Sequence, residues 1–359
     1  MKAYTSNNIR NIAVLGHGGK GKTTLCEAML YIAGASDRLG RVADGNTVLD
    51  FDSEEKRRKS SVSSAIAALE WDNTKLNIID APGLFDFEGG AAEAVRAAEA
   101  VLIVTSAGSG VDVGTEKAFR AAEKKGAAKF FAVTKTDSDH RNFYKTFDAL
   151  KEVYGNKLCP TIIPYMEGNI TKCYVNLMTG MAFSYDENGK ATKVPVPEDS
   201  VIEEMTSAFM ESVATTDDAL MEKFFEGEKF TKEEILKGLC IGIFDGSIYP
   251  VYAVSGLTCA GVDQLLYGLA WSAPGAFGYA GEKCTYENGE EGILPCDENG
   301  PLAAVCFKTI ADPFVGKMSF FKVVSGKLAP DTAAYNFRTG EIEKMGKIVF
   351  VKGTKQEDA

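Results

Sequence analysis

A glycine-rich run near the amino end restricts what this chain can fold into more than any other feature. The run reads Gly16-His17-Gly18-Gly19-Lys20-Gly21-Lys22-Thr23. An apolar stretch over 11–15 precedes it, and apolar residues recur at helical spacing over 25–32 after it. Closely spaced glycines let a backbone curl so that several N–H groups point at one anion, and the following helix adds its positive end. The order strand, loop, helix therefore predicts a phosphate-binding loop rather than a plain glycine turn.

The side chains of this loop have separate expected roles. Lys22 is expected to reach the β- and γ-phosphates of a nucleotide, and the Thr23 hydroxyl is expected to bind Mg²⁺. The rest of the expected phosphate-contacting set is Gly16, His17, Gly18, Gly19, Lys20, Gly21 and Thr24. For His17 we favour a local structural role over proton transfer.

A second motif, Asp80-Ala81-Pro82-Gly83, follows the apolar run 75–79. At the end of a buried strand, Asp80 is expected to hold the Mg²⁺ shell through water, and the Gly83 N–H is expected to contact the γ-phosphate. Asp-x-Pro-Gly alone is a common turn. Its place downstream of a phosphate loop makes the functional interpretation much more specific.

A third motif, Thr134-Lys135-Thr136-Asp137, follows the apolar run 130–133. The Asp137 carboxylate is suited to accept hydrogen bonds from N1 and N2 of guanine, which adenine does not offer, and the Lys135 stem is suited to cover the base. A solvated loop acid is the alternative. After the last apolar run come Ser255, Gly256 and Leu257, where a backbone N–H would meet guanine O6. The three motifs together predict GTP or GDP with Mg²⁺.

The chain alternates between short buried strands and helices. The expected strands cover 11–15, 75–79, 101–104, 130–133 and 251–254, and the expected helices cover 91–100, 116–125 and 143–154. This alternation predicts an α/β fold, a phosphate-loop nucleotide-binding domain whose mostly parallel sheet has helices on both faces.

The alternation is interrupted once and then ends. Residues 157–248 are expected to be an inserted α+β subdomain, strand-like over 161–197 and helical over 198–240, within a nucleotide-binding domain covering 1–275. The polar, glycine-rich stretch 276–300 is expected to be a linker. Residues 301–359 are expected to begin an antiparallel β-barrel that is truncated at the end of the chain. Its expected strands are 303–309, 318–324, 333–337 and 347–351.

Bulk properties exclude several classes of protein. The net charge of −11 argues against binding of naked DNA through a broad basic surface. Eight cysteines without a Cys-x-x-Cys pair, together with only two histidines, argue against a structural zinc site. Because we find neither a bilayer-length apolar run nor a signal peptide, we expect a cytoplasmic monomer without membrane contact.

In order and spacing these motifs resemble those of the translational GTPases, above all bacterial elongation factor G and its paralogues. The segments with the resemblance are Gly21-Lys22-Thr23-Thr24, Asp80-Ala81-Pro82-Gly83 with Phe85-Asp86-Phe87, Lys135 with Asp137, and the stretches 217–227, 261–266, 312–317 and 324–326. The last two lie far from the nucleotide motifs, and a generic GTPase would lack them.

The resemblance implies a GTP-binding and GTP-hydrolysing module that acts on the ribosome within a longer protein. It implies roles in hydrolysis for Lys22, Ser61 and Gly83. Ser61 occupies the position of a family threonine that contacts Mg²⁺ and the γ-phosphate, so it joins Thr23 and Asp80 as a metal-binding candidate. The segment 37–64 is expected to be ordered mainly by γ-phosphate and Mg²⁺.

Three departures from the family pattern indicate a divergent paralogue with slow intrinsic hydrolysis. Leu84 replaces the usual catalytic histidine, Gly19 replaces an aspartate, and Thr134 replaces the asparagine of the guanine motif. The family's barrel also continues beyond the last expected strand, and three further domains follow it, so we expect this chain to be the amino-terminal part of such a protein.

Two other interpretations remain open from the sequence. The first is a nucleotide-dependent switch that binds the ribosome and hydrolyses little GTP, in ribosome protection or recycling. The second is a partitioning-type ATPase with a phosphate loop. The second is disfavoured because His17 stands where that family has a lysine, and because Asp137 and the barrel segment have no place in it.

Overall fold

The computed structural model describes residues 4–138, 142–276, 281–286, 288–312 and 316–358. Within these residues, ten strands form one sheet in the order β2-β3-β1-β4-β5-β10-β6-β7-β8-β9. These strands are β1 (Ile9–Leu15), β2 (Ala65–Trp71), β3 (Thr74–Asp80), β4 (Ala100–Ser106), β5 (Ala128–Thr134), β6 (Leu158–Glu167), β7 (Ile170–Asn176), β8 (Met181–Tyr185), β9 (Ala191–Val194) and β10 (Tyr249–Ala253).

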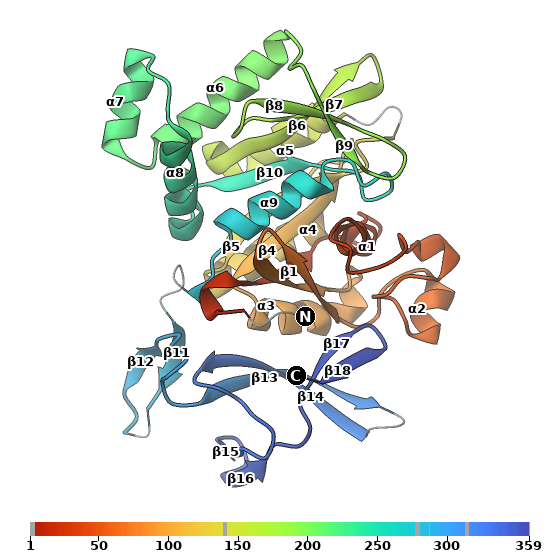
Figure 1. Cartoon of the computed structure of the whole chain (residues 1–359), viewed down its shortest axis with the longest axis vertical. Helices are drawn as coiled ribbons and strands as arrows, with labels where there is room; N and C mark the ends of the chain where they lie inside the picture. The colour runs from red at the N-terminus through yellow and green to blue at the C-terminus, as the bar shows by residue number, and fades with distance from the viewer. Residues whose placement is uncertain (1–3, 139–141, 277–280, 287, 313–315, 359) are drawn as a thin grey trace.

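Helices lie on both faces of this sheet (Figure 1). The α-helices are α1 (Lys22–Ile32), α2 (Ser53–Arg58), α3 (Glu88–Ala97), α4 (Val113–Lys125), α5 (Phe143–Tyr154), α6 (Ser200–Ala214), α7 (Asp218–Glu226), α8 (Lys232–Asp245) and α9 (Val262–Ser272). Four 3-10 turns are η1 (Ser6–Asn8), η2 (Val42–Asp44), η3 (Phe85–Phe87) and η4 (Gly155–Lys157).

The middle of the sheet is parallel, and its two central strands are completely buried. Strands β3, β1, β4, β5, β10 and β6 pair in parallel, and every residue of β4 and β5 is buried. Strands covered on both faces must be apolar throughout, which is why these segments read as continuous runs rather than alternating ones. The predicted α/β fold is confirmed. The carboxyl ends of the parallel strands meet at one edge, so the loops that follow them also meet there.

The segment 157–248 contains the strands and helices expected for it, and its strands extend the main sheet. Strand β6 pairs in parallel with β10, and β7, β8 and β9 follow as an antiparallel meander. A turn at 186–189 joins β8 to β9, where the Gly189 N–H donates to the Asp186 carbonyl. In Figure 1 this segment occupies the top of the molecule, with α6, α7 and α8 beside the strands.

Three details of the predicted order differ from the structure. The helix expected over 91–100 ends at Ala97, because the Glu99 N–H joins the sheet by donating to the Asn11 carbonyl, and Ala100 begins β4. The expected linker 276–300 contains a hairpin of β11 (Glu282–Thr285) and β12 (Glu291–Leu294). Strand β2 was not anticipated, because its alanine-rich sequence shows no strong strand pattern.

The antiparallel strands expected after residue 301 are present as two-stranded sheets. They are β13 (Ala303–Asp312) with β14 (Gly316–Ser325), β15 (Ala333–Asn336) with β16 (Glu341–Lys344), and β17 (Val349–Lys352) with β18 (Lys355–Asp358). The middle of the 312–317 motif, residues 313–315, lies outside the described residues. In Figure 1 these hairpins lie below the nucleotide-binding domain.

A buried lysine joins the C-terminal strands to the nucleotide-binding domain. The Lys308 ammonium on β13 donates to Ser63 Oγ and to the Ser64 carbonyl at 2.5 Å each, and to Ser64 Oγ at 2.9 Å. The Glu93 carboxylate on α3 lies 3.5 Å away. Burial lowers the pKa of Lys308, and Glu93 opposes that shift. The Lys308 ammonium therefore links strand β13 to the segment around Ser63 and Ser64 and to helix α3.

We expect Lys308→Met to weaken this attachment. Breaking a buried ion pair leaves its partners uncompensated and costs about 3 kcal/mol. The variant should unfold at lower denaturant concentration, and a protease should cut the stretch 276–300 faster. Lys317→Met, a change at an exposed lysine on the same hairpin, is the matched control. If the two variants unfold at the same denaturant concentration and are cut at the same rate, the Lys308 contact does not contribute to stability.

Candidate nucleotide-binding site

The phosphate loop folds around the ammonium of Lys22. Lys22 is the first residue of α1, and its Nζ donates to the carbonyls of Gly16 and His17 at 3.0 Å each. Burial lowers the pKa of Lys22, while the negative charge of Asp80 opposes that shift. The lysine is thus bent back over its own loop, where an anion held by the loop would meet its charge.

Gly83 lies directly against this loop. A Cβ at Gly83 would stand 2.2 Å from Lys22 Nζ and 2.7 Å from the Gly18 nitrogen. A side chain there would displace the ammonium, so the close approach requires glycine. The loop after β3 and the phosphate loop therefore border the same space, as the sequence pattern predicts.

Buried oxygen atoms gather beside Lys22. Thr23 Oγ1 lies 3.1 Å from Ser61 Oγ, which donates to Asp50 Oδ1 at 2.7 Å. Asp80, which is 1% exposed, lies in the same group of oxygens. Burial, followed by the charge of Asp50, raises the pKa of Asp80 to about 7.

This donor set fits Mg²⁺. Carboxylate and hydroxyl oxygens are the protein ligands that Mg²⁺ prefers, and the ion keeps several waters of its own. Oδ2 of Asp50 and at least one carboxylate oxygen of Asp80 are buried without a hydrogen-bond partner among the described residues. A divalent cation or its bound water would supply the missing partner and offset the cost of burying these carboxylates.

Asp50 is a site residue that sequence reasoning missed. It is 4% exposed and lines the same pocket as Ser61. It ends no buried strand and belongs to no glycine motif. The only available signal was its position just before the charged run 52–61, which composition assigns to a solvated loop.

The segment 37–64 is held by protein contacts of its own, which the expectation of ligand-driven ordering did not include. Glu27 Oε1 on α1 accepts from the N–H groups of Val48 and Leu49 at 2.8 and 3.0 Å. The Asp52 carboxylate caps α2 by accepting from the Glu54 N–H at 2.7 Å. The segment therefore reaches Ser61 along a defined path anchored to α1.

The loop after β5 is tied to the phosphate loop at two points. Thr134 Oγ1 donates to the Lys20 carbonyl at 2.6 Å and lies 3.0 Å from the Thr105 carbonyl. Lys135 Nζ donates to the Gly19 carbonyl at 2.7 Å. The threonine that replaces the family asparagine thus still supplies a hydrogen-bonding group to the phosphate loop.

Asp137 and the segment 255–257 complete the expected base-binding loops. Asp137 is half-buried, and its Oδ1 has no hydrogen-bond partner among the described residues. Ser255 is fully buried, and its Oγ accepts from the N–H groups of Leu257 and Thr258 at 3.2 and 3.1 Å. Gly256 packs against the backbone of Thr24 on α1.

A pocket of about 400 Å³ lies between these elements, which is a usual volume for a small-molecule site. Its lining residues are Gly18, Gly19, Gly21, Lys22, Thr23, Thr24, Val42, Asp50, Lys59, Ser60, Ser61, Gly83, Leu84 and Lys135. The structure therefore brings most of the predicted phosphate and metal residues together. Asp80 lies buried behind this lining, and Thr134, Asp137 and Ser255 lie outside it.

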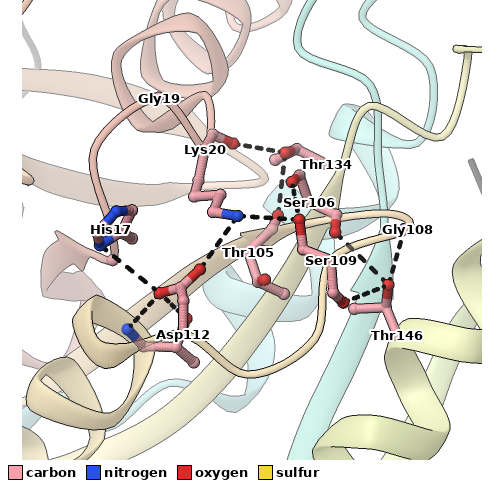
Figure 2. A network of polar contacts seen from close by, with 12 residues as sticks. His17, Gly19, Lys20, Thr105, Ser106, Gly108, Ser109, Asp112, Thr134 and Thr146 are labelled. Atoms are coloured by element: carbon pink, nitrogen blue, oxygen red, sulfur yellow. Dashed lines mark hydrogen bonds and ion pairs between the residues drawn. The ribbon is translucent and has the colours of Figure 1, made fainter.

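Figure 2 shows the side chains of Lys20 and His17 directed toward Asp112, and neither residue is among those that line the pocket. Lys20 Nζ lies 3.1 Å from Asp112 Oδ2 and donates to Ser109 Oγ at 2.9 Å. His17 Nδ1 lies 3.9 Å from Asp112 Oδ1. Asp112 caps α4 by accepting from the Thr115 N–H. These two side chains brace the loop against the turn before α4, in keeping with the local role favoured for His17.

The fold, the phosphate loop and the buried Asp80 define a nucleotide-binding domain of the phosphate-loop class. The family model "Elongation factor Tu GTP binding domain" matches residues 7–274. The chain belongs to this family of GTPases, and its membership excludes the partitioning-type ATPase. Among the described residues, no helix has the length and apolar character needed to cross a membrane.

Individual relatives agree with this assignment. The chain is similar to proteins named "Elongation factor G-like protein" from two strains of Mycobacterium tuberculosis, CDC 1551 / Oshkosh and ATCC 25618 / H37Rv. Each is 32% identical over 331 residues, which is 91% of this chain and 46% of the relative. The resemblance to elongation factor G-like proteins is confirmed.

A solved structure shows the same similarity. A crystal structure of a protein from Thermus thermophilus matches 98% of this chain and 50% of that protein, with a TM-score of 0.86 and 31% identity. The chain therefore spans about half the length of these relatives.

The raised pKa of Asp80 gives a testable pH dependence. The unfolded carboxyl titrates near 3.9 and the folded one at about 7, so the folded state binds the extra proton in this window. The stability of the metal-free protein therefore falls as the pH rises from about 4 to about 7. Asp80→Asn should make the protein in EDTA more stable at pH 8, on the order of 4 kcal/mol, with a smaller gain at pH 5.

Thermal unfolding at both pH values is the measurement. Asp86→Asn, a change at an exposed carboxylate six residues further along the chain, is the control and should have no such effect. A gain for Asp80→Asn that is the same at pH 5 and pH 8 would contradict the assigned shift.

Proposed function

We propose that this chain is the GTP-binding and GTP-hydrolysing module of an elongation factor G-like translation factor that acts on the ribosome in the cytoplasm. The observation that supports guanine recognition is the buried Oδ1 of Asp137, which has no hydrogen-bond partner among the described residues and lies beside a lysine tied to the phosphate loop. Buried acceptors are normally paired, so a ligand that offers donors here would suit this oxygen. The N1–H and N2 groups of guanine are donors of the right kind.

Each remaining role follows from the position of a group around the pocket. Lys22 would neutralise charge on the β- and γ-phosphates, and the Gly83 N–H would contact the γ-phosphate. Thr23 and Ser61 would hold Mg²⁺ directly, and Asp80 would hold it through water, with Asp50 orienting Ser61. When bound, Mg²⁺ supplies charge neutralisation between the β- and γ-phosphates.

Leu84 supports a slow intrinsic rate. Its side chain lines the pocket. It also lies close to Gly18, since a Cβ built on Gly18 would be 3.0 Å from Leu84 Cδ2. It would therefore lie near the phosphates of a bound nucleotide. A leucine neither donates nor accepts a hydrogen bond, so it leaves an attacking water without orientation from this side.

Action on the ribosome rests on the similarity to elongation factor G-like proteins. The loss of a water-orienting group at Leu84 favours one alternative, a nucleotide-dependent ribosome-binding switch of the protection or recycling type that hydrolyses little GTP. Turnover of GTP with and without ribosomes, measured on the longer parent protein, separates the two. Strong stimulation by ribosomes would exclude the pure switch, and no ribosome binding in either nucleotide state would exclude both.

Guanine recognition is tested at Asp137. In Asp137→Asn an amide N–H would face guanine donors, so the affinity for GDP should fall about 50-fold, as expected for losing hydrogen bonds to a charged group. Xanthosine diphosphate offers a carbonyl at the same position, so its affinity should rise. Calorimetric titration with Mg²⁺ present measures both. Tighter binding of ATP than of GTP by the unchanged protein would reject the proposed function.

The slow rate is tested at Leu84. We expect Leu84→His to raise single-turnover GTP hydrolysis about tenfold or more, because a histidine can orient or polarise the attacking water. Leu84→Met, which keeps an apolar side chain of similar volume, is the control and should leave the rate unchanged. Hydrolysis by the unchanged protein as fast as by the histidine variant would show that this position does not limit the rate.

A further inference from the structure

The two loops expected to contact the base are joined to each other. They follow β5 and β10, which are neighbours in the sheet and parallel. Thr136 Oγ1 lies 3.0 Å from the Val254 carbonyl, to which it donates, and the Val254 N–H donates to the Val133 carbonyl at 3.0 Å. A shift of one loop is therefore passed to the other.

The first of these loops has a backbone shape that needs support. Lys135 has a φ of +60°, a left-handed conformation that costs a non-glycine residue roughly 1 kcal/mol. Thr134 and Thr136 flank it, and each is 2% exposed with a hydrogen-bonded hydroxyl. The placement of Lys135 and of Asp137 thus depends on these two anchors, one on each side of the strained residue.

The second anchor is held from outside the two loops, by strand β7 of the segment 157–248. The Tyr174 hydroxyl lies 2.7 Å from Thr136 Oγ1. Since the one hydroxyl proton of Thr136 is directed to Val254, Tyr174 must be the donor. Thr171 Oγ1 donates to the Thr136 carbonyl at 2.7 Å. Both the side chain and the carbonyl of Thr136 are therefore fixed by β7.

The same segment also fixes the start of α9, behind the second loop. The Tyr174 ring lies against Gly261. The Tyr185 hydroxyl donates to Asp263 Oδ1 at 2.6 Å, and Asn176 Nδ2 donates to Gln264 Oε1 at 2.9 Å. Tyr174 is 4% exposed and contacts Tyr185 edge to face. Through these contacts, the segment 157–248 touches the surroundings of both base loops.

We propose that the inserted segment 157–248 positions the loops that recognise the base, with Tyr174 as its positioning residue. This inference rests on the proposed binding of guanine nucleotide. Without the phenol hydroxyl, Thr136 keeps its bond to Val254 but loses the donor that fixes its orientation. Asp137, the next residue, then meets the guanine edge with poorer geometry, while the phosphate loop keeps its hydrogen bond from Thr134.

The test compares a ligand that reaches the base loops with one that does not. Tyr174→Phe should lower the affinity for GDP about fivefold, the usual effect of losing one buried hydrogen bond, and leave the affinity for tripolyphosphate unchanged. Tyr144→Phe is the matched control. It also removes a phenol hydroxyl with a hydrogen bond, here to the Pro164 carbonyl at 2.6 Å, and should change neither affinity.

Changes at Thr136 test whether Tyr174 acts on GDP binding through the Thr136 hydroxyl. Thr136→Val removes both hydroxyl contacts, so GDP affinity should fall about 20-fold, and adding Tyr174→Phe should lower it less than twofold further. Thr136→Ser, which keeps a hydroxyl, should retain most of the GDP affinity. The titrations with GDP and with tripolyphosphate use the whole chain with Mg²⁺. A thermal unfolding curve is measured for each variant.

Three outcomes overturn the inference. They are unchanged GDP affinity in Tyr174→Phe, equal losses of GDP and tripolyphosphate affinity, and full additivity of the Tyr174 and Thr136 effects. The affinity of the unchanged protein for GDP and for ADP is measured alongside. If the unchanged protein prefers GDP, the proposed function survives each of these three outcomes. An unchanged protein without that preference overturns both together.

Discussion

The close approach of the phosphate loop to strand β4 is the constraint on which the rest of the site depends. Gly16 has a φ of +141°, and a Cβ there would stand 2.2 Å from the Val104 carbonyl. Only glycine permits this contact, which fixes where the chain leaves β1 and turns into α1. The ammonium of Lys22, the backbone at Gly83 and the hydroxyl of Thr134 all contact the loop so positioned.

Much of this arrangement could be predicted because it is encoded locally. The glycine spacing of 16–23, the acid that ends β3 and the loop that ends β5 each lie within a few residues of the strand that places them. Parallel strands then bring those ends to one edge of the sheet without further information. For this reason the α/β fold and the pairing of Lys22 with the loop around Gly83 follow from the sequence.

The features that were missed depend on contacts between distant segments. Asp50 is identified only by its packing against Ser61, and the direction of the Lys20 side chain is set by Asp112 on another loop. The hairpin in 276–300 was hidden for a different reason. Each of its strands is only four residues long, too short for composition or periodicity to distinguish it from a linker.

The buried ammonium of Lys308 changes where the nucleotide-binding unit ends. The family match stops at residue 274, yet the donor that satisfies Ser63 and Ser64 is more than thirty residues beyond that point, on β13. A recombinant piece cut at the family boundary would remove the cation that contacts Ser63, Ser64 and Glu93. Of these residues, Ser63 lies two positions from Ser61. The smallest piece suited to biochemical work therefore includes the β13–β14 hairpin.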